Sequence, residues 1–94
     1  MKVGKHTTFM IKFILDFVNS ELERYFFDLD YSAYVIEHFP HMELENSRLA
    51  DRFTYTIDRA YERGTDLGLS DKEFRVEFSN ALDEWLGRKK PDII

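Results

Sequence analysis

The chain contains no cysteine in its 94 residues. It therefore has no disulfide framework, no thiolate nucleophile and no cysteine ligand for zinc. This absence fits a protein of the reducing cytoplasm, where disulfides are rare.

Glycine and proline are scarce, with four and two residues, and they fall where structural elements should end. The four glycines are isolated from one another, so the chain has no P-loop or other glycine-rich nucleotide loop: they are Gly4, Gly64, Gly68 and Gly87. No repeat, low-complexity tract or linker interrupts the sequence. We therefore expect one helical domain over residues 1–94, with mobile ends at about 1–6 and 88–94.

No stretch of the chain is apolar enough to act as a membrane anchor. The longest apolar run, residues 9–18, is interrupted by Lys12 and Asp16. A membrane-spanning helix needs about 20 apolar residues, and a signal peptide needs a small-residue cleavage site that residues 19–23 do not provide. The run therefore predicts a core helix in a cytoplasmic protein.

Positive charge is also in short supply. Thirteen lysine and arginine residues stand against eighteen aspartate and glutamate residues, which gives a net charge of −5. Such a chain has no overall attraction to nucleic-acid phosphates or to anionic membranes. The charge is also too small to indicate a DNA mimic.

Aromatic residues, in contrast, are abundant, since nine Phe, five Tyr and one Trp make up 16% of the chain. Each aromatic side chain buries a large area, so a small core needs few of them. Fifteen is more than the core of so short a chain readily hides. We therefore expect some of them at an interface, either in a dimer or on a partner-binding surface.

Apolar periodicity predicts a first helix from Thr7 or Thr8 to about Phe27. Its first half is apolar on most sides, which is typical of a helix that is central in the fold or covered by a second chain. The residues that recur at helical spacing form its predicted core stripe: Ile11, Ile14, Leu15, Val18, Leu22, Tyr25, Phe26 and Leu29.

A short second helix is expected next. Asp30 or Ser32 can cap it, and Pro40 should stop it at or before Phe39. Residues 31–36 also suit a strand, so the sequence leaves helix and strand open there.

A third helix is predicted from Asn46 or Ser47 to Arg63, with Gly64 as its left-handed terminator. The alternation over residues 53–57 resembles a strand, but the helical period continues beyond it. The expected core positions are Leu49, Phe53, Ile57, Ala60 and Tyr61.

The fourth helix has the clearest start, because Ser70 and Glu73 form a capping-box pattern, and Gly87 should end it. Its apolar face consists of Phe74, Phe78, Ala81, Leu82 and Trp85. The short connection over residues 64–69 indicates that helices three and four pack as an antiparallel hairpin. The predicted fold is all-α, a compact bundle of about four helices in which the second is short.

Arginines recur along one side of the third helix. At 100° per residue, Arg48, Arg52, Arg59 and Arg63 lie within about 60° of one another, with Tyr55 beside them. An arginine row around a tyrosine suits phosphates, carboxylates or stacked bases. These five residues are therefore the predicted partner-binding surface.

A second interpretation, which we favour, pairs these arginines inside the molecule. Glu73, Glu77 and Glu84 form a row on the fourth helix that can face the arginines across the seam and form surface salt bridges. A nucleic-acid site is the least favoured alternative, because the fourth helix is acidic where DNA phosphates would lie.

Trp85 is added to the predicted surface for its residue type. It falls on a core stripe, where packing is its ordinary role. Tryptophan is also a favoured anchor at interfaces, so a contact with a partner remains an alternative.

The histidines and carboxylates predict no metal site and no catalytic site. His38 and His41 flank Pro40, which should break the helix between them, and His6 belongs to the mobile N-terminal end. The acidic pairs lack the pattern of a calcium loop and are explained by capping and solvation. We therefore expect a solvated turn around Pro40, no cofactor and no enzyme activity.

Four hypotheses about function remain, and no family resemblance decides between them. The leading one is a small acidic protein-binding module that regulates or neutralises a larger protein, a build that is common among bacterial and phage accessory proteins. The second is a structural homodimer in which the first helix is buried by its own copy. The third is a nucleic-acid-associated protein that uses the arginine row. The fourth is an enzyme or ligand-binding domain, which a well-formed pocket lined by His38, His41 or the arginines and holding a ligand or metal would favour.

Overall fold

The computed structural model describes residues 3–87, and this part of the chain contains helices and short connections but no strand. In chain order the elements are α1 (Lys5–Val18), α2 (Arg24–Glu45), α3 (Ser47–Phe53), the π-helix η1 (Thr54–Asp58), α4 (Arg59–Leu67) and α5 (Asp71–Leu86). The all-α class is confirmed, and residues 31–36 are helix. No helix within residues 3–87 is long and apolar enough to cross a membrane.

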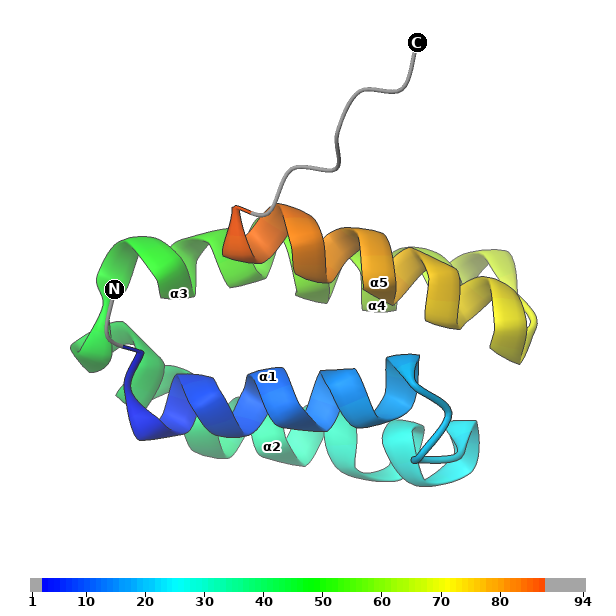
Figure 1. The fold of residues 1–94 in the computed structure, drawn as a ribbon, viewed down its shortest axis with the longest axis horizontal. Helices are drawn as coiled ribbons and strands as arrows, with labels where there is room; N and C mark the ends of the chain where they lie inside the picture. The colour runs from blue at the N-terminus through cyan, green and yellow to red at the C-terminus, as the bar shows by residue number, and fades with distance from the viewer. Residues whose placement is uncertain (1–2, 88–94) are drawn as a thin grey trace, which may run out of the picture.

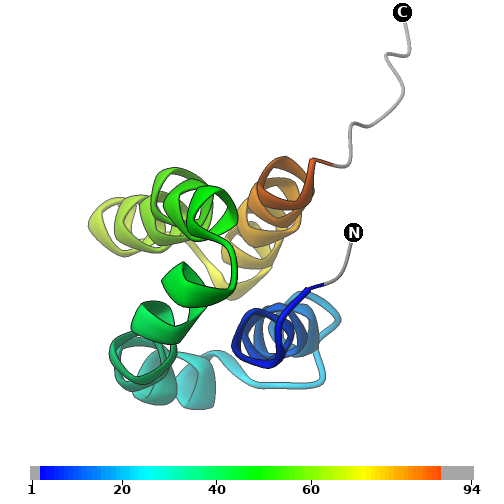
Figure 2. The same ribbon diagram turned by 90° about the vertical axis from the view of Figure 1, so that its left-hand side faces the viewer.

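The elements form four rods, because α3, η1 and α4 follow one another without a break. α1 and α2 make one layer, and the rod α3–η1–α4 makes the other layer with α5 (Figure 1). Seen end-on, the rods stand at the corners of a rough square (Figure 2). α1 contacts α2 and α5, and α5 contacts α3, η1 and α4, so the core lies between the two layers.

The first helix ends at Val18, so the prediction that it reaches Phe27 is wrong. Ser20 adopts a left-handed backbone with φ of 63°, and the carbonyl of Asp16 accepts hydrogen bonds from the amides of Glu21 and Leu22. The chain therefore reverses over residues 19–23 and starts α2 in a new rotational phase. As a result, three members of the predicted core stripe are exposed instead: Tyr25, Phe26 and Leu29.

α2 is 22 residues long, so the prediction of a short second helix is also wrong. Pro40 lies inside it and cannot donate the hydrogen bond that the carbonyl of Ile36 would accept. Ile36 and Pro40 are both exposed, so water can bond to that carbonyl, and the helix continues to Glu45.

The third rod begins at Ser47 as predicted, with the Asn46 side chain accepting a hydrogen bond from the amide of Leu49 at 3.1 Å. Gly64 does not end it, because α4 continues to Leu67 and Gly68 adopts the left-handed conformation with φ of 61°. Gly64 is instead buried inside α4 against the ring of Phe74. A Cβ at Gly64 would stand 2.2 Å from Cε1 of that ring, so only glycine fits there without a rearrangement.

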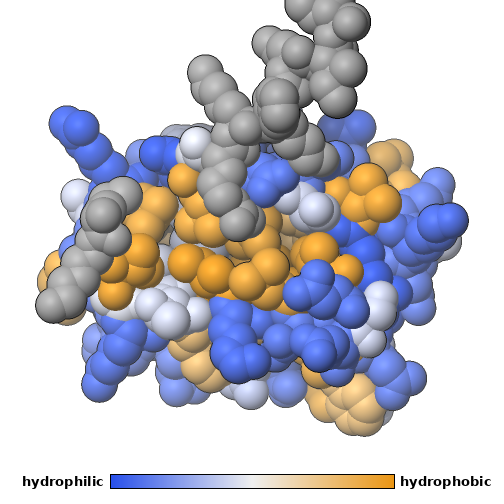
Figure 3. Space-filling view, in the orientation of Figure 1, coloured by the Kyte–Doolittle hydropathy of each residue, from blue (hydrophilic) through white to orange (hydrophobic). Residues whose placement is uncertain are grey.

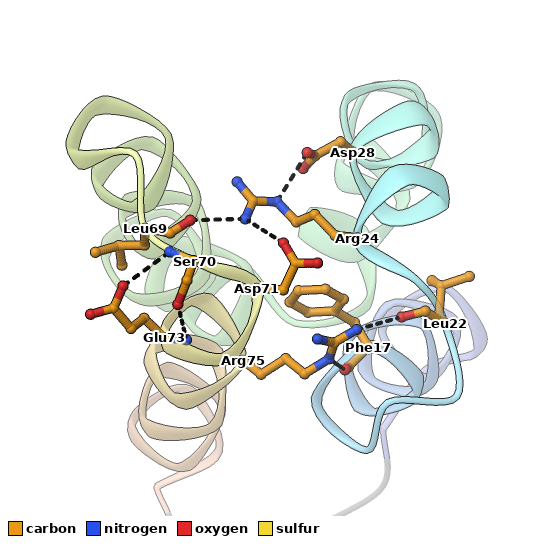
Figure 4. Close-up of polar contacts among 9 residues, drawn as sticks. All are labelled: Phe17, Leu22, Arg24, Asp28, Leu69, Ser70, Asp71, Glu73 and Arg75. Atoms are coloured by element: carbon orange, nitrogen blue, oxygen red, sulfur yellow. Dashed lines mark hydrogen bonds and ion pairs between the residues drawn. The ribbon is translucent and has the colours of Figure 1, made fainter.

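α5 begins and ends as predicted. The Ser70 hydroxyl accepts a hydrogen bond from the amide of Glu73 at 3.2 Å, and the Glu73 carboxylate accepts one from the amide of Ser70 at 3.0 Å (Figure 4). The capping box is thus confirmed, and its hydrogen bonds, the one from the Ser70 amide first, lower the pKa of the Glu73 carboxyl. Gly87 ends the helix with φ of 71°, and all five residues of the predicted apolar face are buried.

Aromatic rings fill most of the core. Phe27 is fully buried, and its ring stacks on those of Phe13 and Phe17 with centroids 5.0 Å and 4.1 Å away. Eight of the fifteen aromatic side chains are buried: Phe13, Phe17, Phe27, Tyr31, Phe53, Phe74, Phe78 and Trp85. Four stay exposed, as the aromatic surplus led us to expect: Phe9, Tyr25, Phe26 and Tyr55.

Arg24, at the start of α2, ties that helix to the start of α5. Its guanidinium donates to the carbonyl of Leu69 at 3.1 Å and forms ion pairs with Asp28 and Asp71 at 3.0 Å and 3.3 Å (Figure 4). The same group lies 4.0 Å above the ring of Phe74. One side chain thus joins the two layers through hydrogen bonds and a cation–π contact.

Arg75 makes the reciprocal connection from α5 to the end of α1. Its guanidinium donates to the carbonyls of Phe17 at 2.9 Å and Leu22 at 3.4 Å, and it lies 4.7 Å from the ring of Phe17 (Figure 4). We call Arg24 and Arg75 together the arginine clasp, because each reaches from one layer to the other at the same end of the bundle.

Candidate functional site

The predicted arginine row is spread over three elements of one rod. Arg48 and Arg52 belong to α3, Tyr55 to η1, and Arg59 and Arg63 to α4. All five residues are exposed. The structure nevertheless gives these residues different roles. Arg59 and Arg63 line a pocket with Tyr55, whereas Arg52 is bound to the end of α5.

The π-helix in the middle of this rod has no signal in the sequence. The hydroxyl of Thr56 donates to the carbonyl of Arg52 at 2.6 Å, and the phenol of Tyr31 in α2 donates to Asp58 at 3.0 Å. Burial and then the charge of Asp58 raise the pKa of Tyr31, so its hydroxyl stays a donor. π-turns recur at functional sites, and this one turns Ile57 into the core while Tyr55 stays exposed.

Arg52 is used inside the molecule. Its guanidinium donates to the carbonyl of Trp85 at 2.8 Å and to that of Glu84 at 3.3 Å. The last carbonyls of a helix lack partners within the helix, so Arg52 caps the carboxyl end of α5. Arg52 is therefore a structural residue in this fold.

Trp85 is fully buried, and its indole N–H donates to the carbonyl of Leu49 at 2.8 Å. A side chain in this position cannot contact a partner while the bundle is folded. The structure thus gives Trp85 the packing role of a core residue, so it is not part of the predicted partner-binding surface.

Tyr55, Arg59 and Arg63 line a shallow pocket of about 270 Å³ between the third rod and α5. Glu77 and Glu84 line its opposite wall. Arginine and glutamate rows therefore face each other, as the second interpretation of the row expected. No ion pair joins them, however, since the lysine and arginine side chains paired with carboxylates within residues 3–87 are Lys12 and Arg24.

The pocket is balanced in charge, and this balance limits what it can hold. A nucleic-acid backbone that approached Arg59 and Arg63 would also meet Glu77 and Glu84. We therefore find no support here for the nucleic-acid alternative.

The three histidines form a cluster, so the expectation of a solvated turn with a distant His6 is wrong. Nδ1 of His6 lies 2.8 Å from Nδ1 of His38, and the ring of His6 stacks on that of His41 at 4.2 Å. His38 is buried, and Phe9 stacks on it. Within residues 3–87 no three carboxylate or histidine side chains stand where they could hold a metal ion together.

Glu45 explains why His6 is held in place. Its carboxylate accepts hydrogen bonds from the amides of His6 at 2.8 Å and Thr7 at 3.0 Å, and from the Thr7 hydroxyl at 2.7 Å. Burial acts to raise the pKa of Glu45, but these hydrogen bonds outweigh it and lower the pKa. The end of α2 thus caps the start of α1, and residues 5 and 6, predicted to be mobile, form the first turn of α1.

We expect stability to fall as the pH drops below about 6.5. Partial burial and the neighbouring His41 lower the pKa of His6 from 6.5, Glu45 opposes them, and His38 and Lys5 add to them. The unfolded chain therefore binds a proton at His6 more readily than the folded chain does. The contribution of His6 to the free energy of unfolding is thus complete above pH 6.5 and is lost on acidification. Thermal unfolding followed by circular dichroism at pH 7.5, 6.5 and 5.5 measures it.

The His6→Phe variant provides the comparison for this pH effect, because it keeps an aromatic ring but removes the titrating group. Its thermal midpoint should change less between pH 7.5 and 5.5 than that of the wild-type protein. Equal changes in the two proteins would show that His6 does not contribute to the pH dependence.

The most prominent exposed feature lies on α2 and was not predicted. Of the nine exposed large apolar residues within the described chain, five belong to α2: Tyr25, Phe26, Leu29, Ile36 and Leu44. Tyr25, Leu29, Ile36 and Leu44 keep 62–86% of their surface exposed. The only sequence signal was the polar segment of residues 19–23, which marks the break that resets the phase of the helix.

These residues form one continuous surface along the helix. At 100° per residue, all its members fall within about 100° of one another on the side away from the core. We call this surface the α2 stripe and define it as Tyr25, Leu29, Ala33, Ile36, Pro40 and Leu44, all of which are exposed. Isolated apolar residues on a surface are ordinary, whereas large contiguous apolar patches are typical of interaction sites.

A second apolar area is visible on the face that carries α1 and α5. Apolar side chains form a band across the middle of this face (Figure 3). Ile11 and Leu15 of α1 are only partly buried, and Val76 of α5 is exposed. α1 is otherwise covered by α2 and α5, so most of its apolar surface is buried within one chain.

Comparison of the chain with models of protein families, with curated proteins and with solved structures finds no match.

Proposed function

We propose that this protein is a non-catalytic binding module that docks on a larger protein through the α2 stripe and thereby regulates or neutralises it. The observation that carries the proposal is the concentration of exposed apolar side chains on the outer side of α2. Their burial against a partner would be favourable by about 25 cal/mol for each Å² of apolar surface removed from water.

A further feature supports a binding role. α2 is one continuous helix whose inner side packs on α1 and α3, so the stripe is presented on a well-packed element.

The double variant Leu29→Glu/Ile36→Glu should lose the partner while keeping its fold. Both side chains are largely exposed, so each substitution should change the free energy of unfolding by no more than about 0.5 kcal/mol. The measurement is chemical cross-linking in the cells that contain the protein, followed by mass spectrometry of the cross-linked partner.

Leu67→Glu is the matched control, because it adds a carboxylate at another exposed apolar residue, at the end of α4. A partner that cross-links to the wild-type protein and to the control, but not to the stripe variant, supports the proposal. Equal cross-linking of all three proteins would show that the stripe is not the docking surface.

A homodimer is the second candidate function, favoured by the apolar band along α1 and α5 (Figure 3). Light scattering behind a sizing column at two concentrations gives the molar mass. A dimer that Ile11→Glu dissociates and Leu29→Glu does not would assign the contact to α1.

A further inference from the structure

The acidic charge of the protein is concentrated in the segment that carries the α2 stripe. Residues 19–46 contain seven carboxylates and one arginine, a net charge of −6, whereas the whole chain carries −5. The remaining residues are therefore close to neutral as a group. The seven carboxylates belong to Glu21, Glu23, Asp28, Asp30, Glu37, Glu43 and Glu45.

The segment contains no lysine, and its one arginine is already engaged. Arg24 is bound to Asp28, Asp71 and the carbonyl of Leu69. Glu21, Glu23, Glu37 and Glu43 are exposed. The apolar stripe therefore has a rim of exposed carboxylates, and within residues 19–46 no available lysine or arginine offsets them.

The shape of the stripe suits a helix. Its members recur at intervals of three or four residues from Tyr25 to Leu44, over about 29 Å at 1.5 Å per residue. An amphipathic helix of about five turns that presents its own residues at the same intervals can pack along it.

Charge then selects among the possible occupants. A second copy would bring a second segment of net charge −6 against the first, and an anionic membrane would be repelled in the same way. Lysine and arginine at the edges of an amphipathic helix would instead meet the carboxylate rim while its apolar side covers the stripe.

We infer that the α2 stripe binds a basic amphipathic helix of a partner protein. This inference rests on the proposed docking role of the stripe and names the chemistry of its occupant. The apolar residues supply most of the affinity, and the carboxylate rim selects basic helices and accelerates their association.

The probe is a synthetic helical peptide of about 18 residues with leucine at intervals of three and four and lysine elsewhere. Its control is the same peptide with glutamate in place of every lysine. Fluorescence anisotropy of the labelled peptides gives the dissociation constants. We expect the lysine peptide to bind at least about tenfold more tightly than the glutamate peptide, and salt to weaken its binding.

Three variants separate apolar contact from general attraction between opposite charges. Leu29→Glu/Ile36→Glu makes the surface more acidic, so purely electrostatic binding would become tighter, whereas the inference expects binding about tenfold weaker. Glu37→Gln/Glu43→Gln should weaken binding severalfold and reduce its dependence on salt. Leu67→Glu, at the end of α4 and outside both apolar surfaces, should bind as the wild-type protein does.

The possible outcomes distinguish this inference from the proposed function. No binding of the lysine peptide, or equal binding by the stripe variant, overturns the inference. If the cross-linked cellular partner is nevertheless lost in the stripe variant, the docking role stands and its occupant is not a basic helix. Wild-type molecules that self-associate through the stripe, with the variant monomeric, would assign the surface to a second copy and overturn the inference.

Discussion

Replacing Phe27 with alanine is expected to lower the free energy of unfolding by about 3–5 kcal/mol. The Phe27 ring is fully buried and contacts the rings of Phe13, Phe17 and Phe78, so its removal leaves a cavity between the two layers. A chain of this length has about 5–14 kcal/mol of stability at ~0.05–0.15 kcal/mol per residue. The substitution should therefore remove a large share of the total stability.

Phe26→Ala is the matched comparison, because it removes the same side chain one residue earlier. Phe26 is exposed and contacts only Tyr25 among the aromatic rings, so we expect a loss of no more than about 1 kcal/mol. Urea unfolding followed by circular dichroism measures both variants. A larger loss of unfolding free energy for Phe26→Ala than for Phe27→Ala would contradict this structure and favour the continuous first helix that the sequence predicted.

The Gly64→Ala variant is expected to lose about 1–3 kcal/mol, although alanine favours helices by about 1 kcal/mol over glycine. The new Cβ would lie 2.2–2.3 Å from two carbons of the Phe74 ring. This ring cannot withdraw easily, because Phe17 and Phe78 pack against it and Arg24 lies over its face. Urea unfolding again gives the free energy.

A second substitution tests the cause of the Gly64 effect. In the double variant Gly64→Ala/Phe74→Leu, the smaller leucine side chain makes room for the new Cβ. The losses of unfolding free energy in the single variants Gly64→Ala and Phe74→Leu should therefore sum to more than the loss in the double variant. Gly68→Ala is the control, because nothing lies within 4 Å of a Cβ there and its cost comes from the left-handed backbone alone. Additive losses for Gly64 and Phe74 would contradict the steric explanation.

Local signals in the sequence predicted the parts of the fold that local interactions determine. The capping box at Ser70 and the helix end at Gly87 were correct because both depend on residues within one turn. The buried face of α5 was correct because this helix has no break to shift its phase. The all-α class followed from the same kind of information.

Elements that depend on distant residues were predicted less well. Residues 19–23 contain no glycine or proline, and α1 ends there in part because Arg75 binds the carbonyls of Phe17 and Leu22 from more than 50 residues away. Pro40 is tolerated within α2 because it lies on the exposed side of that helix. Neither condition can be read from neighbouring residues.

The candidate site shows the same division. The alignment of Tyr55, Arg59 and Arg63 was predicted, since helical spacing alone places them together. The engagement of Arg52 at the end of α5 depends on how the rods pack, as does the contact of Glu45 with His6. The α2 stripe was missed because the first helix was extended through the break, which assigned Tyr25 and Leu29 to the core.

The arginine clasp has a consequence for the thermodynamics of binding. Arg24 fixes the amino end of α2 against α5, and Glu45 fixes its carboxyl end against α1, so the helix that carries the stripe is held at both ends. A partner then meets a preorganised surface and need not order it, which removes one unfavourable entropy term from association. The heat-capacity change on binding should accordingly reflect only the apolar area covered by the partner, without the larger change of a coupled folding transition in this chain.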